Sequence, residues 1–145
     1  MTERQLELCP NFSHSEIKKA NGKLSGIDFE TFMRLQNLRI AIKRRIYFQI
    51  NGINSGNHFL ESHPKGKAYD IYFDSRDGII AFHDAISILK KALLVGFNEI
   101  GLYWNGIMYS FHFGRGSKYR FWSAEKKTEK KDWAYHSLIV DPKKF

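Results

Sequence analysis

Cysteine is nearly absent from this 145-residue sequence, which contains only Cys9. One cysteine excludes an internal disulfide and any metal site that is built from several thiolates. The sequence also has no run of about 18 apolar residues, the length that a membrane-spanning helix needs. Its first thirty residues have no apolar stretch of the kind found in signal peptides. We therefore expect a protein without a membrane span that is cytoplasmic as made.

Acidic residues are scarce relative to basic ones. Lysine and arginine number 23 against 15 aspartates and glutamates, which gives a formal charge of +8 and a pI near 9.6. Such a balance favours polyanionic partners: nucleic acid, anionic lipid or the acidic polymers of a bacterial cell wall. Because the sequence contains no recognised nucleic-acid-binding motif, nucleic acid is not favoured as the partner.

The apolar pattern predicts one α+β domain over residues 1–145; its core, at about 11–123, is the part that a family resemblance given below covers. Helices are predicted from about Ser13, where Glu16 completes a capping box, from Asp28 to Arg45, and from about Arg76 to Val95. Strands are predicted at 46–50, 68–73, 99–104 and 108–113, the last two joined by a hairpin at Asn105-Gly106.

These elements predict a small antiparallel sheet with helices packed on one side. A basic, aromatic tail follows residue 114, and we expect its aromatic side chains to pack it back onto the domain; they are Phe121, Trp122, Trp133 and Tyr135. Residues 51–67 form a long loop, and long ordered loops in small domains tend to be functional.

The end of this loop contains the residues that indicate chemistry. His63 lies at the loop end and Asp70 follows seven residues later on the next strand, so that both side chains can point at one centre. Gly66 allows a sharp turn between them, and Ala68 leaves room beside the site. Histidine and carboxylate are favoured zinc ligands, and a catalytic zinc site needs three protein ligands. His112 is well placed to be the third, although its apolar strand also suits a core histidine.

The wider pattern Ser62-x-His63-x-x-Gly66-x-Ala68-x-Asp70 resembles the signature of the zinc D-Ala-D-Ala carboxypeptidases and L,D-endopeptidases that act on peptidoglycan. This family shares its fold with the hedgehog signalling domain. The opening at residues 11–16 and the closing hairpin that ends in Phe111-His112 also resemble its phage-type branch.

The resemblance implies a hedgehog/DD-peptidase-like fold with one zinc ion, for which His63, Asp70 and His112 would be the ligands. It implies a metallopeptidase that hydrolyses cross-bridges or stem peptides of bacterial peptidoglycan, such as a phage lysis protein (endolysin) or a virion protein. The peptidoglycan peptide would be the partner of the site.

Two positions depart from the family pattern. Asn54 stands where the family usually has an arginine that pairs with a substrate carboxylate, and an amide supplies no charge. Tyr109 and Gly114 stand where relatives often have an acid that serves as the general base. Candidate general bases elsewhere are Glu99 and Glu61, and the expected substrate-binding residues are Asn54, Ser62, His58 and Tyr109. The alternative is a catalytically weakened or inactive zinc-binding module on the same fold, which binds the cell wall or serves a structural role.

Overall fold

The structure is a computed structural model, which describes residues 1–56, 58, 60–126 and 133–139. Its helices are α1 (Glu3–Leu6), α2 (His14–Lys19), α3 (Phe29–Ile42) and α4 (Phe82–Leu94), with short 3-10 turns η1 (Leu24–Gly26) and η2 (Ser75–Asp77). Its strands are β1 (Tyr47–Phe48), β2 (Ala68–Tyr72), β3 (Glu99–Trp104), β4 (Tyr109–Gly114), β5 (Arg120–Glu125) and β6 (Ala134–Ile139). An α+β class is confirmed.

Two of the helices before β1, α2 and α3, begin at the predicted caps, whereas the short α1, capped by Thr2, was not predicted. The Ser13 hydroxyl accepts from the Glu16 amide, and the Glu16 carboxylate accepts from the Ser13 amide, so the capping box of α2 is complete. The Asp28 carboxylate accepts from the backbone amide and the hydroxyl of Thr31 at the start of α3. The helix α3 ends where Lys43 adopts a left-handed conformation with φ 54°. Both starts follow from local sequence.

The helix predicted from about Arg76 to Val95 is two elements, because the chain is extended between η2 and α4 and Gly78 has φ 109°. The buried face of α4 consists of Ala85, Ile88 and Ala92. The side chain of Phe82, the first residue of α4, is exposed. Small residues on this face let α4 pack closely against the sheet.

The strands form one six-stranded sheet in the order β1-β2-β4-β3-β5-β6. It is mixed, whereas an antiparallel sheet was predicted, because β5 runs parallel to β3. The chain leaves β4 at Gly114 beside Glu99, the first residue of β3, and enters β5 at Arg120, on the other side of the same residue. The Asn98 side chain holds this crossing by donating to the carbonyl of Gly116 and accepting from its amide, both at 2.8 Å.

The strands β5 and β6 are formed by the segment that was expected to be a packed tail. Trp133 lies edge-on against Tyr103 of β3, with ring centroids 5.2 Å apart, and Phe121 packs against the core. The tail therefore joins the domain by sheet pairing as well as by aromatic contacts.

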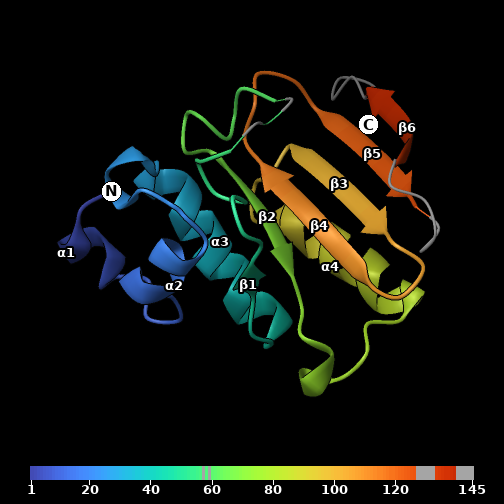
Figure 1. Ribbon diagram of the computed structural model, residues 1–145, viewed down its shortest axis with the longest axis horizontal. Coiled ribbons are helices and arrows are strands. Elements are labelled where there is room, and N and C mark those ends of the chain that lie inside the picture. Colours follow the sequence, from blue (N-terminus) through green and yellow to red (C-terminus); the bar gives the residue numbers. More distant parts are fainter. Residues whose placement is uncertain (57, 59, 127–132, 140–145) are drawn as a thin grey trace.

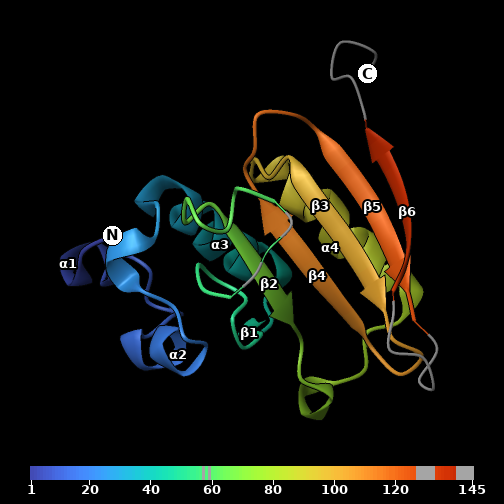
Figure 2. The same cartoon turned by 45° about the horizontal axis from the view of Figure 1, so that its top comes forward.

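The helices α3 and α4 cover one face of the sheet and leave the middle of the other face free of helices, as two views show (Figure 1 and Figure 2). Alternate residues of β2 and β4 point into the core beneath these helices, namely Tyr69, Ile71, Phe111 and Phe113. We call the opposite side, onto which Asp70 and His112 project, the open face. Within the described part of the chain, every helix is too short or too polar to cross a membrane.

Candidate metal centre

His63 is positioned by a tight turn at the end of the loop between β1 and β2. The Gly66 amide donates to the carbonyl of His63 (2.9 Å), and the Lys67 amide donates to the carbonyl of Ser62 (2.8 Å). Gly66 has φ +69°, and a Cβ there would overlap the backbone of Gly26. The predicted turn at Gly66 is thus present, and it brings the chain from His63 directly into β2.

The orientation of the His63 ring is fixed by a backbone carbonyl. Its Nδ1 lies 2.6 Å from the carbonyl oxygen of Ile53, inside the protein. Because a carbonyl can only accept, Nδ1 carries the proton and Nε2 keeps its lone pair. This contact between a histidine and a backbone oxygen is typical of metal-binding imidazoles. Sequence reasoning missed Ile53, since a main-chain oxygen leaves no signal in residue type.

Asp70 and His112 lie side by side because they are directly paired in the register of β2 and β4. Asp70 Oδ1 lies 2.9 Å from His112 Nδ1, and both atoms lie close to the lone pair of His63. His63 Nε2 is 3.2 Å from His112 Nδ1 and 3.3 Å from Asp70 Oδ1. The structure therefore brings the three predicted ligands together, each through one ligand atom.

The size of this triangle suits a metal ion. Ligand atoms at the usual zinc distances of about 2.0–2.1 Å, arranged tetrahedrally, are about 3.3 Å apart. The observed separations of 2.9, 3.2 and 3.3 Å are close to that value. Two imidazole nitrogens with one carboxylate oxygen are also a donor set that zinc accepts.

The charges around the triangle favour a cation. Burial raises the pKa of the Asp70 carboxyl, but hydrogen bonds from His112 and His63 in their protonated forms outweigh it, and the pKa lies well below its ordinary value. Burial lowers the pKa of His112, whereas Asp70 and Glu99 raise it, and the net pKa is raised. Asp70 thus favours positive charge beside it, which either protonated imidazoles or a divalent cation supplies.

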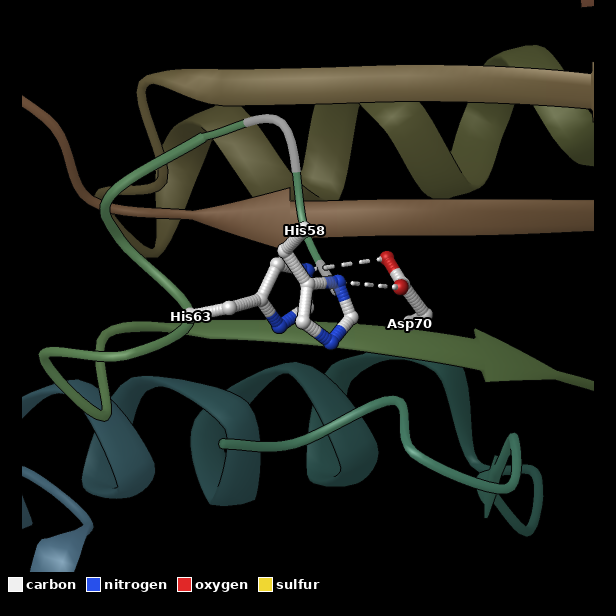
Figure 3. Close-up of side chains that lie close together, drawn as sticks. All are labelled: His58, His63 and Asp70. Carbon is white, nitrogen blue, oxygen red and sulfur yellow. Dashed lines mark ion pairs between the residues drawn. The ribbon is translucent and has the colours of Figure 1, made fainter. Parts of the chain in front are cut away.

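His58 lies over this site as a fourth polar group (Figure 3). Its ring stacks on the ring of His63 with centroids 3.7 Å apart and an interplanar angle of 17°. Its Nε2 lies within 2.7 Å of the carbonyl oxygens of Asn51 and Ser55, so that nitrogen is the donor. The other nitrogen, Nδ1, faces Asp70 Oδ2 at 3.7 Å with its lone pair free. His58, His63 and Asp70 thus form a group that could hold a metal ion.

The other residues predicted from the loop have different surroundings. The Asn54 amide is occupied at both ends by the backbone of Lys23, which it accepts from and donates to at 2.8 Å. The Glu61 side chain is 88% exposed and pairs with Lys65 at 3.3 Å. Asn54 thus ties the loop to the segment before α3, and Glu61 lies in solvent, so neither is brought to the triangle.

Three other predicted residues lie outside the triangle. Ser62 and Glu99 are buried, and Glu99 Oε1 lies 3.7 Å from His112 Nε2, the nitrogen that points away from the triangle. Tyr109 lies two residues before Phe111 on β4, so both side chains project to the same face of the sheet, toward the helices. The ring of Tyr109 lies 6.4 Å from that of Phe82. The structure thus brings Glu99 to the side of His112 that faces away from the triangle, buries Ser62, and leaves Tyr109 on the other face of the sheet.

An aromatic wall adjoins the triangle on the open face. The ring of Trp122 lies 4.9 Å from the ring of His112 and covers Gly101, where any side chain would collide with it. Its Nε1 donates to the hydroxyl of Tyr103 at 2.8 Å, which fixes both rings. A bound molecule that reached Asp70 along the open face would contact this wall.

Comparison of the chain with protein-family models, with curated proteins and with solved structures finds no match in any of the three. The interpretation of the site therefore depends on its geometry and on the chemistry of its donor atoms.

Proposed function

We propose that this protein is a zinc-dependent peptidase that hydrolyses peptides of bacterial peptidoglycan. The observation that carries the proposal is the triangle of His63 Nε2, Asp70 Oδ1 and His112 Nδ1, whose sides measure 2.9–3.3 Å. Three protein ligands of this kind are typical of catalytic zinc sites, which keep a position open for water or substrate. The peptidoglycan substrate is supported by the resemblance of residues 62–70 to the peptidase signature and by the +8 charge, which suits an anionic wall.

Zinc at this triangle would polarise a peptide carbonyl and lower the pKa of a water molecule to about 7. The chain itself must supply a proton acceptor. His58 Nδ1 has the required free lone pair beside the Asp70 carboxylate, and the carbonyls of Asn51 and Ser55 hold its other nitrogen as the donor. We assign to His58 Nδ1 the acceptance of the proton from the attacking water.

The open face supplies the place for the substrate. The wall of Trp122 and Tyr103 lies on one side of His112, and the Asp70 side chain is 28% exposed, so the triangle is reachable from solvent. Asn54 is held by Lys23, and the charged grip that a carboxypeptidase needs on a free C-terminus is missing at that position. We therefore favour an endopeptidase over a carboxypeptidase.

A second function is favoured by one observation, the proximity of His58 to the ligands. Candidate ligand atoms of His58, His63 and Asp70 lie within 4.8 Å of one another. If His58 and His112 both bound the ion with His63 and Asp70, four protein groups would close the site, as in structural zinc sites. The protein would then be a zinc-stabilised wall-binding or structural module without activity.

One experiment separates the two functions. Wild-type protein, His63→Ala and His58→Ala are loaded with zinc, analysed for metal and incubated with purified peptidoglycan, and the released fragments are identified by mass. The exposed His83, on the outer side of α4, provides the control variant His83→Ala. The peptidase predicts about one zinc per chain and fragment release in wild type and control, zinc without release in His58→Ala, and neither in His63→Ala.

The closed module predicts no release from any variant and weaker zinc binding in His58→Ala. Equal release from wild type and His63→Ala would remove the peptidase proposal, because the activity would not depend on the triangle.

A further inference from the structure

The buried carboxylate of Glu99 occupies space that two glycines leave free. Glu99 is 4% exposed and is paired in register with Gly114 on β4. A Cβ at Gly114 would lie 2.7 Å from Glu99 Oε1 and 3.0 Å from His112 Nε2, and a Cβ at Gly116 would overlap Glu99 Oε2. The carboxylate therefore fits beside His112 only because positions 114 and 116 have no side chain.

The buried polar atoms of Glu99 and His112 face each other. His112 Nε2 and Glu99 Oε1 are 3.7 Å apart, and both atoms are buried with no hydrogen-bond partner among the described residues. Buried polar atoms without partners are costly, so such a facing pair is a strong indication of an interaction. The Ser62 hydroxyl is also buried without a hydrogen-bond partner among the described residues.

The other nitrogen of His112 is the one that belongs to the triangle. A carboxylate at Nε2 keeps the proton on that nitrogen and leaves the lone pair on Nδ1, where the ligand atom is needed. The imidazole ring also stands between Glu99 and the triangle. The Glu99 oxygens consequently contact His112 from the rear, and the geometry suits orientation of the ligand better than proton transfer to substrate.

We infer that Glu99 is a positioning residue, which holds His112 with Nδ1 directed at the metal ion from the neighbouring strand β3. The inference rests on the metal-binding part of the proposed function and does not depend on the substrate. It makes Glu99, Gly114 and Gly116 one unit, in which the glycines serve to admit the carboxylate.

The first test is zinc affinity, measured by competition with a chromophoric chelator. Glu99→Ala and the isosteric Glu99→Gln should each weaken zinc binding by about 10- to 100-fold, the usual cost of losing such a partner. The cobalt-loaded variants should also show shifted visible absorption bands, because the orientation of a ligand has changed. If the alanine variant does not fold, the zinc affinity of Glu99→Gln is the deciding measurement.

The second test displaces the carboxylate without changing Glu99. Gly116→Ala should weaken zinc binding when Glu99 is present, because a Cβ there overlaps Glu99 Oε2. In the Glu99→Ala background, where that space is free, the same substitution should change zinc affinity little. Equal losses of zinc affinity in the two backgrounds would show that Gly116 does not act through Glu99.

Zinc affinity within twofold of wild type in Glu99→Gln would overturn the inference, provided that His63→Ala has lost zinc. If His63→Ala binds zinc as wild type does, the metal centre itself is wrong, and the two failures are thereby distinguished.

Discussion

The two faces of β2 and β4 show how one pair of strands serves stability and chemistry separately. Three consecutive cross-strand pairs alternate between the faces: Tyr69 with Phe113, Asp70 with His112, and Ile71 with Phe111. The outer two pairs are buried beneath the helices, and the middle pair forms part of the triangle on the open face.

The packing of the core sets the register of β2 and β4, and thereby the positions of Asp70 and His112. A slip of β2 by one residue would turn Asp70 toward the core and Tyr69 and Ile71 toward the open face, at a large cost in apolar burial. The core pairs therefore hold the ligands in place without touching a metal ion. The two faces should respond independently to substitution.

The largest effect is expected on the core face. Phe113 is fully buried, and its ring lies 5.7 Å from that of Phe97. Phe113→Ala should lower the free energy of unfolding by about 3–5 kcal/mol through lost burial and the cavity left behind. Urea denaturation with zinc and with a chelator measures it, and the loss should be the same in both. A loss below about 1 kcal/mol would contradict the assignment of this face to the core.

The second-largest effect is expected on the open face, in the stabilisation of the fold by zinc. Zinc at about 100 times its Kd should stabilise the wild type by about 2.7 kcal/mol, and Asp70→Asn should lose most of this gain while remaining folded. The amide keeps the shape of the side chain but is a poor ligand. Thermal and urea denaturation with and without zinc measure the gain. Glu61→Gln is the matched control, because it makes the same acid-to-amide change at an exposed position in the loop before β2, away from the triangle. An equal loss in the control would show that zinc binds elsewhere.

The two faces also differ in how far they could be predicted from the sequence. Local signals located the start of α2 at Ser13, the start of α3 at Asp28 and the hairpin at Asn105, because caps and turns depend on neighbouring residues. His63, Asp70 and His112 were named as a set because residues 62–70 resemble the peptidase signature and because histidine and carboxylate are favoured zinc ligands. Their convergence is visible only in the register of the sheet.

The parts that were missed depend on contacts between distant residues. The parallel pairing of β5 with β3 requires the crossing held by Asn98, which has no local pattern. The choice of Nδ1 in His112 depends on Glu99 across a strand pair, and that of Nε2 in His63 depends on the carbonyl of Ile53. Residue type alone does not specify which nitrogen faces a metal ion.

Asn54 tests whether the open face depends on the segment before α3. Asn54→Ala removes two hydrogen bonds to the backbone of Lys23 and should lower the free energy of unfolding by about 1–2 kcal/mol. Because Asn54 follows Ile53, which orients His63, zinc affinity should fall as well. Asn105→Ala is the matched control: its side chain accepts from the amides of Ile107 and Met108 in the hairpin, away from the triangle.

The control should lose stability but keep its zinc affinity. If both variants keep the affinity of the wild type, the loop is held by other contacts, and the two faces are less connected than the hydrogen bonds of Asn54 indicate.

The smallest effect is expected at Asp28, which belongs to both regions. Its carboxylate caps α3 on the core side, while its backbone amide donates to the carbonyl of Gly66 in the loop at 3.0 Å. Asp28→Ala removes only the cap, so it should cost about 1 kcal/mol of stability and leave zinc affinity unchanged. A loss of zinc affinity would show that the cap and the loop are not separable.

The cost at Asp28 should depend on pH in one direction. Burial raises the pKa of this carboxyl, but the hydrogen bonds from Thr31 and the charge of Lys67 outweigh it, and the folded-state pKa lies below 3.8. The ionised cap therefore stabilises the fold fully above that ordinary value, and its contribution disappears as the pH falls through the lower folded-state pKa. Urea denaturation of wild type and Asp28→Ala should differ at neutral pH and converge in acid. Asp28→Asn, which caps without titrating, should show no such convergence, because its cap persists when the wild-type carboxylate is protonated.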